Sequence, residues 1–149
     1  MDIVCQCFCD QVKNYGIEHV QILSLFRSEG FVGVKQLNWT IREMINPIQD
    51  EAIPDLKVGG RFFRENDKVM QTKNNSKASN GDIGLIRKIA TDEKNEMRVT
   101  ISFGNDRIVE YSCEDMANIE LAYATTVHKA MGSEYDTVII SLSAVMSLC

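Results

Sequence analysis

Residues 121–142 read LAYATTVHKAMGSEYDTVIISL, and this stretch decides how the chain is built. Its two ends, residues 121–125 and 137–142, are rich in apolar and β-branched residues, which predicts two short strands. The segment between them gathers hydroxyl, imidazole, ammonium, glycine and carboxylate groups. Polar groups beside a buried strand cost free energy unless they bind one another or a ligand. This polar turn is therefore the first candidate for a functional site.

The N-terminal part of the chain continues the alternation of strands and helices. Apolar side chains recur with helical spacing over residues 2–15, and Gly16 suits the end of a helix. The apolar run at residues 19–25 predicts a buried strand. Residues 34–45 predict an amphipathic helix that ends before Pro47, because proline disfavours helix in the residue that precedes it. This order of elements is typical of an α/β domain.

The middle of the chain follows a different pattern. Residues 97–103 alternate apolar and polar side chains, and residues 107–112 read as the return strand of a hairpin. Residues 67–73 and 83–89 predict two more strands, joined by a polar loop. Several short antiparallel strands in succession are typical of a small SH3-like or OB-like barrel.

These patterns predict a barrel inserted into an α/β domain. Residues 1–58 form the first part of the α/β domain, residues 59–118 the barrel, and residues 119–149 the remainder of the α/β domain. The expected α/β sheet has few strands. We therefore expect this chain to be a fragment of a longer protein.

Composition limits the class of protein. The chain has 149 residues, of which 44% are hydrophobic, so it can bury a core. It has no apolar run near the ~18 residues that cross a bilayer and no secretory leader, so we expect a cytoplasmic protein with no membrane contact. Its net charge is −5, but between Lys57 and Arg107 there are 11 Lys and Arg against 7 Asp and Glu. This local excess suits a phosphate backbone, although charge alone favours an ordinary solvated surface.

The cysteines do not predict a metal site. Cys5, Cys7 and Cys9 alternate in the first expected helix, a spacing that turns Cys7 away from the other two. Neither histidine has zinc-finger spacing from them. We expect thiols that bind no metal.

The polar turn and two further blocks resemble one family of enzymes. Residues 121–142 look like motif V of the superfamily-one DNA helicases, in the RecD-like branch that includes the exodeoxyribonuclease V alpha subunit and TraA-type relaxase helicases. Residues 20–47 resemble the motif IV region of this branch, and residues 66–75 and 80–84 resemble the start of its inserted SH3-like domain. These blocks occur in the family's order and cover most of the chain from about Gly16 onward.

The resemblance implies an α/β RecA-like fold of the P-loop NTPase type. The chain would be an incomplete second motor domain that carries a small all-β SH3-like barrel. It would form the C-terminal part of an ATP-dependent 5′-to-3′ DNA helicase that acts in DNA repair and recombination. The implied cofactors are ATP and Mg²⁺ in the full-length protein, with none expected on this chain. The implied partners are single-stranded DNA, a missing N-terminal RecA-like domain and nuclease subunits.

The resemblance also implies site residues. The nucleotide side would include Arg27, Gly132 and Glu134, although a plain surface-loop role is the alternative for Arg27. The DNA side would include Thr126, His128 and Lys129. In the barrel, cations and amides suited to phosphates are Arg61, Arg64, Lys68, Lys73, Asn74, Asn75 and Lys77. Met131 departs from the family, which usually has glutamine there.

Other signatures of a complete motor are missing from the sequence. It contains no Gly-x-x-x-x-Gly-Lys-Ser/Thr phosphate loop, and the arginine of motif VI would lie beyond Cys149. We therefore expect this polypeptide alone neither to hydrolyse ATP nor to unwind DNA. The alternative is a non-catalytic adaptor whose SH3-like barrel binds a protein partner. An independent hydrolase that uses His128, Glu134 and a cysteine is disfavoured, since no cysteine lies near the polar turn.

Overall fold

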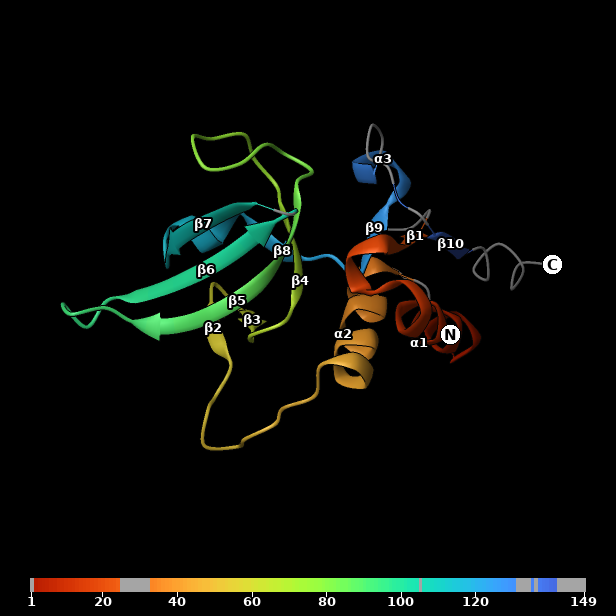
Figure 1. Ribbon diagram of the computed structural model, residues 1–149, viewed down its shortest axis with the longest axis horizontal. Coiled ribbons are helices and arrows are strands. Elements are labelled where there is room, and N and C mark those ends of the chain that lie inside the picture. Colours follow the sequence, from red (N-terminus) through yellow and green to blue (C-terminus); the bar gives the residue numbers. More distant parts are fainter. Residues whose placement is uncertain (1, 25–32, 105, 131–134, 136, 142–149) are drawn as a thin grey trace. The chain divides into compact units, whose positions relative to one another are not determined.

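The chain forms two compact units in a computed structural model that describes residues 2–24, 33–104, 106–130, 135 and 137–141 (Figure 1). Unit 1 comprises Met1–Pro47 and Tyr123–Cys149, and unit 2 comprises Ile48–Ala122. Unit 1 contains α1 (Asp2–Tyr15), η1 (Ile17–His19), β1 (Val20–Ser24), α2 (Val34–Ile45), β9 (Ala124–Thr126), α3 (Val127–Ala130) and β10 (Thr137–Ser141). Unit 2 contains β2 (Leu56–Val58), β3 (Arg61–Phe63), β4 (Lys68–Gln71), β5 (Ile83–Thr91), β6 (Met97–Phe103), β7 (Arg107–Ser112), η2 (Asp115–Asn118) and β8 (Ile119–Leu121).

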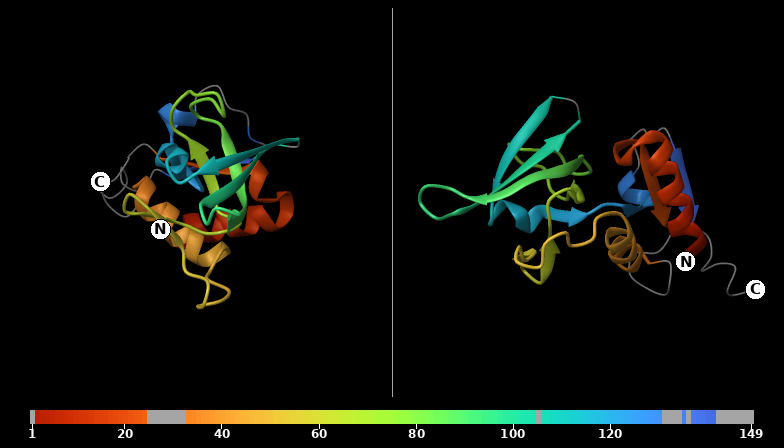
Figure 2. Two further views of the ribbon diagram at one scale, coloured as in Figure 1. Left: turned by 90° about the vertical axis from the view of Figure 1, so that its left-hand side faces the viewer. Right: turned by 60° about the horizontal axis from the view of Figure 1, so that its bottom comes forward.

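Unit 1 is built on a parallel sheet of three strands in the order β10-β1-β9. The helix α1 packs against β1 and β10, while α2 packs against β9 and also contacts α1 (Figure 2). Apolar side chains that these elements bury include Phe8, Ile22, Leu37 and Ile41. Parallel strands joined through helices are the arrangement expected of an α/β domain, so this part of the prediction is confirmed.

The ends of both helices follow from local sequence. Gly16 ends α1 with a φ of 88°, and its N–H bonds the Val12 carbonyl oxygen at 2.8 Å. Glycine adopts such a positive φ without the steric cost that a side chain brings, which explains the stop. Asn46 follows α2 and donates its N–H to the Arg42 carbonyl oxygen at 2.7 Å, just before Pro47. The expected helices at residues 2–15 and 34–45 are confirmed.

Unit 2 contains an antiparallel five-stranded sheet in the order β7-β6-β5-β4-β8. Its core comprises Phe63, Val69, Ala78, Ile86, Val99, Ile101, Phe103, Tyr111, Met116 and Ile119. The strands β6 and β7 occupy the predicted ranges, whereas β5 extends to Thr91. Among the described residues, backbone pairing joins the five strands in an open row and does not link β7 to β8. The expected barrel closure is therefore not formed by these pairings.

A hairpin that the sequence patterns did not predict precedes this sheet. The strands β2 and β3 form a separate two-stranded ribbon in which Lys57 lies opposite Phe62. Gly59 and Gly60 connect them with φ values of 56° and 80°. Positive φ at both central residues is the geometry of a type I′ turn, which matches the twist of a hairpin. The Gly-Gly pair was the available signal for this hairpin.

The boundaries between the units differ from those predicted. Residues 48–58 belong to unit 2 and not to the α/β segment, because β2 pairs with β3. The expected single strand at residues 121–125 is in fact two strands, β8 and β9, in different sheets. The Ala122 N–H still bonds the Lys68 carbonyl oxygen at 2.8 Å in unit 2, whereas the Tyr123 carbonyl oxygen accepts from Ile22 in unit 1. The chain therefore passes from one unit to the other between these two residues.

None of the helices in the described parts of the chain has the length and hydropathy of a membrane-spanning segment.

Candidate functional site

The first part of the candidate site is the carboxyl edge of the unit 1 sheet. Ser24, the last residue of β1, lies in register with Thr126 on β9 and with Ser141 on β10. These three residues therefore end three parallel strands side by side. One position earlier on β9, the Thr125 hydroxyl is buried and has no hydrogen-bond partner among the described residues. The carboxyl edge of a parallel sheet is where α/β folds bind ligands.

Thr126 also directly precedes the short helix α3. Its hydroxyl oxygen accepts a hydrogen bond from the Lys129 N–H at 3.3 Å, as an N-terminal helix cap does. The hydroxyl proton is still able to donate to another acceptor. Of the expected DNA-contacting residues in the polar turn, the structure thus brings Thr126 and Lys129 together, and His128 lies on the same turn of backbone.

The residues expected on the nucleotide side lie outside the described residues. These are Arg27, Gly132 and Glu134, together with the family departure at Met131.

A bidentate contact that the sequence did not reveal holds β9 in place. The Asn38 side chain, on α2, donates to the Ala124 carbonyl oxygen at 3.0 Å and accepts from the Ala124 N–H at 2.8 Å. Asn38 is 5% exposed and Ala124 is 1% exposed. The side-chain amide therefore pairs with this edge strand as a neighbouring strand would. This contact positions the start of the polar turn.

The second part of the candidate site is the loop between β4 and β5, and Gln71 closes it. The Gln71 N–H bonds the Asp82 carbonyl oxygen at 2.9 Å, and its carbonyl oxygen accepts from Gly81 at 2.8 Å. The buried Gln71 amide donates to the Lys73 carbonyl oxygen at 2.8 Å and accepts from the Tyr111 hydroxyl at 2.8 Å. Three of these hydrogen bonds close the loop at its base, and the fourth ties Gln71 to β7.

Within this loop, the two asparagines organise the backbone. The Asn74 oxygen accepts from the Asn80 N–H at 2.8 Å, and the Asn75 oxygen accepts from the N–H groups of Lys77 and Ala78 at 2.8 and 3.1 Å. Their carbonyl oxygens are therefore engaged, while their amide nitrogens are the groups that could donate to a phosphate. The exposed Lys73 lies directly before them.

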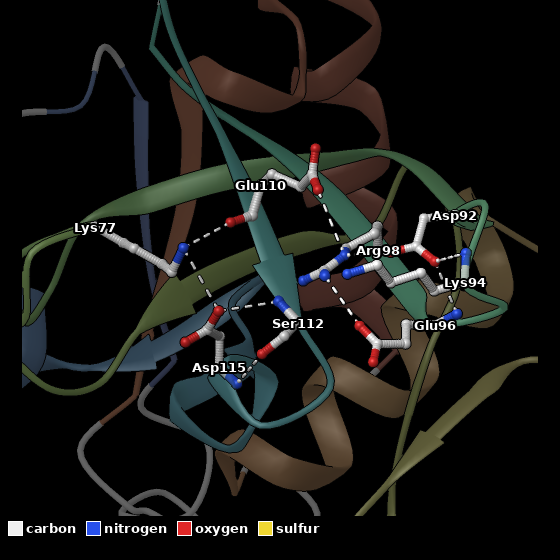
Figure 3. Close-up of polar contacts among 8 residues, drawn as sticks. All are labelled: Lys77, Asp92, Lys94, Glu96, Arg98, Glu110, Ser112 and Asp115. Atoms are coloured by element: carbon white, nitrogen blue, oxygen red, sulfur yellow. Dashed lines mark hydrogen bonds and ion pairs between the residues drawn. The ribbon is translucent and has the colours of Figure 1, made fainter.

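Lys77 has structural contacts on β7 and η2 (Figure 3). Its Nζ donates to the Glu110 carbonyl oxygen at 2.9 Å and lies 3.5 Å from the Asp115 carboxylate. It also lies over the buried Tyr111 ring, 5.7 Å from the centroid. Because β7 is an edge strand, the lysine covers a carbonyl group that would otherwise be open to pairing. A phosphate contact from Lys77 would have to compete with these interactions.

A neighbouring cluster braces the turn between β5 and β6 (Figure 3). The Asp92 carboxylate accepts from the N–H groups of Lys94 and Glu96, at 2.8 and 2.9 Å, and from Arg98 Nε at 3.1 Å. The Glu96 N–H bond lowers the pKa of Asp92 most, and Arg98 lowers it further. The hydrogen bond to Asp92 in turn raises the pKa of Arg98. Arg98 also contacts Glu96 and Glu110, so its charge is compensated.

Three cations expected to face DNA are engaged within unit 2. Arg61 donates to the carbonyl oxygens of Ile119 and Ala117. Arg64 forms a bidentate pair with Asp55 at 2.9 and 2.8 Å. Lys68 is fully buried. A phosphate contact from any of these three residues would have to compete with these interactions or with burial.

The positive charge of the middle segment is not a property of unit 2 as a whole. Unit 2 contains 11 Lys and Arg against 14 Asp and Glu, a net charge of −3. The flanking residues that β2 and β8 bring into the unit supply the additional carboxylates. A polyanion would therefore meet local groups of cations and not a uniformly basic surface.

We expect Asp115 to make the stability of unit 2 depend on pH. Burial alone would raise its pKa, but hydrogen bonds from Ser112 and the nearby Lys77 hold the pKa below its ordinary value of 3.8. The ionised carboxylate thus stabilises the fold above pH 3.8, and this contribution is lost as the pH falls through the lower folded pKa. Between neutral pH and about pH 2, the melting temperature should fall more steeply for the parent chain than for Asp115→Asn. Parallel dependence of the two melting temperatures on pH would contradict the assignment.

Comparison with known proteins tests the predicted resemblance. Residues 37–103 match the family model described as the SH3 domain of ATP-dependent RecD-like DNA helicases. The ATP-dependent RecD2 DNA helicase of Deinococcus radiodurans is 33% identical over 122 residues, which are 80% of this chain and 16% of that protein. The predicted resemblance to RecD-like helicases is therefore confirmed. The chain spans about a sixth of this relative's length. Among solved structures, unliganded Pif1 from Bacteroides sp. aligns with 86% of this chain and 47% of its own, at 20% identity and a TM-score of 0.47.

Proposed function

We propose that this chain is the part of a RecD-like 5′-to-3′ DNA helicase that contributes half of the ATP cleft and part of the single-stranded DNA track. Unit 1 would be the second RecA-like domain, and unit 2 its inserted SH3 domain. The observation that carries the proposal is the interruption of a parallel sheet, between α2 and β9, by a unit that overlaps the RecD-like SH3 match.

The carboxyl edge of the unit 1 sheet is the proposed motor side. Thr126, His128 and Lys129 would contact the DNA backbone, and Arg27, Gly132 and Glu134 would face ATP and its Mg²⁺, which a further RecA-like domain would help to hold. Hydroxyl and ammonium groups suit phosphate oxygens. Thr126 supports this role because its hydroxyl proton is not used by the bond to Lys129.

Lys73 is the proposed DNA contact of unit 2 that is simplest to test. It is exposed, it belongs to a loop that Gln71 closes, and no ion pair involves it among the described residues. A preorganised loop binds with little loss of conformational entropy. Asn74 and Asn75 would add amide donors beside it.

Fluorescence anisotropy of labelled oligo-dT, titrated with this chain at low and moderate salt, tests the proposal. We expect weak binding that fades as salt rises. Lys73→Glu should weaken it several-fold and reduce the salt slope by about 0.7, the contribution of one phosphate on a single strand. Lys94→Glu is the matched control, since it makes the same charge change at an exposed turn. Absence of binding at either salt would favour the protein-binding adaptor instead.

A further inference from the structure

We infer that the β2–β3 hairpin presents Phe62 as a stacking surface for a base of single-stranded DNA, with Lys57 beside it for the adjoining phosphate. This rests on the proposed function and gives unit 2 a second contact with the strand, separate from the β4–β5 loop. Phe62 is 41% exposed, and Lys57 Nζ lies 5.8 Å from the centre of its ring.

The hairpin holds Phe62 in a fixed place. Phe62 lies directly opposite Lys57 on one face of the ribbon. On the other face, Phe63 is 1% exposed in the core of unit 2, and Arg61 donates to the Ile119 and Ala117 carbonyl oxygens. Successive side chains of a strand point to opposite faces, so anchoring Arg61 and Phe63 turns Phe62 outward. A base could then stack without first ordering this part of the chain.

The absence of a carboxylate partner distinguishes Lys57 of this hairpin from several other cations in the described part of unit 2. Arg64, Arg98, Arg107 and Lys77 are each compensated by a carboxylate. In the described part of unit 2, the lysines that form neither a salt bridge nor a buried contact are Lys57, Lys73, Lys88 and Lys94. Of these four, Lys57 is the one that lies over an aromatic ring.

Two further cation–ring pairs in the described part of unit 2 do not offer the same surface. Lys77 covers Tyr111, which is fully buried, and Arg107 covers Phe103, which is 7% exposed and belongs to the core. At the hairpin, both the ring and the ammonium group reach solvent. The nearby Asp55 carboxylate is compensated by its bidentate pair with Arg64. An aromatic ring next to an uncompensated cation is the combination that binds single strands without reading sequence.

The test compares two oligomers of equal length, oligo-dT and an abasic strand with the same number of phosphates, at one salt concentration. Phe62→Ala should weaken binding of oligo-dT at least about fivefold, as loss of one stacked base does, and should leave binding of the abasic strand unchanged. Phe62→Trp should restore the affinity for oligo-dT. Lys57→Ala should weaken both strands similarly, because both carry phosphates.

Ile108→Ala is the matched control, since Ile108 is an apolar residue 68% exposed on β7. Equal affinity of Phe62→Ala and the parent chain for oligo-dT, with Lys73→Glu still weakening it, would overturn the stacking surface while leaving the proposed function intact. Equal weakening of both strands by Phe62→Ala would also overturn it. Failure of the parent chain to bind either strand would overturn both proposals and assign the exposed ring to a protein partner.

Discussion

Replacing Asn38 by alanine is expected to lower the free energy of unfolding of unit 1 by about 2–4 kcal/mol. The change removes both hydrogen bonds that the side chain makes to Ala124, at 3.0 and 2.8 Å. It leaves a buried N–H and a buried carbonyl group on an edge strand without their partner, and each costs free energy to bury alone. The loss should also release the start of the polar turn, because Ala124 begins the strand that leads into it.

The neighbouring residue provides the measurement. Trp39 is the single tryptophan of the chain and lies on α2 with Arg42 5.1 Å from its ring centre, so its fluorescence reports on unit 1. Urea unfolding followed at Trp39 should shift to a lower midpoint in Asn38→Ala. Gln36→Ala is the control, since its amide makes an exposed 3.5 Å contact with Thr40 on the same helix. Equal midpoints in the three proteins would show that Asn38 does not hold β9.

The same contact shows how far the sequence could be interpreted. Periodicity placed Asn38 in a helix, but its partner is 86 positions away, beyond the whole of unit 2. No local pattern identifies an amide that pairs with a distant edge strand. Resemblance to motif IV marked the segment as important without giving the reason. The physical reason is the pairing with Ala124.

Local sequence patterns predicted the elements that depend on residues close to one another in the chain. Alternation predicted β6, its hairpin turn predicted β7 as the return strand, and Gly16 marked the end of α1. They failed for β2 and β3, because these strands have three residues each and are too short to show a periodic pattern. They also failed between Ala122 and Tyr123, where an apolar run continues although its backbone changes sheets. Nothing in such a run indicates which sheet its N–H groups will join.

In the candidate site, too, the sequence predicted some features and missed others. Polar composition directed attention to the loop that contains Lys73, and this lysine is exposed in the structure. Charge counting could not tell this lysine from Lys77, whose partner Asp115 follows three intervening strands along the chain. Nor could it identify Lys57, because the ring beside it belongs to an unpredicted hairpin. Which cations are available to a polyanion is decided by tertiary contacts, and these appear only in the folded chain.

Unit 2 should be sensitive to change at Gly84, where β5 leaves no room for a side chain beside β6. A Cβ atom there would lie 2.8 Å from both Ile101 Cγ2 and the Ser102 carbonyl oxygen, and 3.0 Å from Phe103 Cδ1. Such overpacking costs typically about 1–3 kcal/mol, and a branched side chain at a site that already excludes one methyl group exceeds this. We expect Gly84→Val to destabilise unit 2 by about 3 kcal/mol or more.

The clash is severe because one of the atoms that a side chain at residue 84 would meet is a backbone oxygen. Ile101 or Phe103 could change rotamer, but the Ser102 carbonyl belongs to β6 itself, so β5 and β6 would have to separate. Hydrogen exchange of β5 and β6 amides should therefore accelerate in Gly84→Val, together with a lower urea midpoint by circular dichroism. Thr91→Val, an isosteric change at the exposed end of β5, should stay within about 0.5 kcal/mol of the parent. If Gly84→Val matched Thr91→Val, the close approach of these strands would not limit the stability of unit 2, and the glycine of the Asn-Gly-Asp-Ile-Gly block would need another explanation.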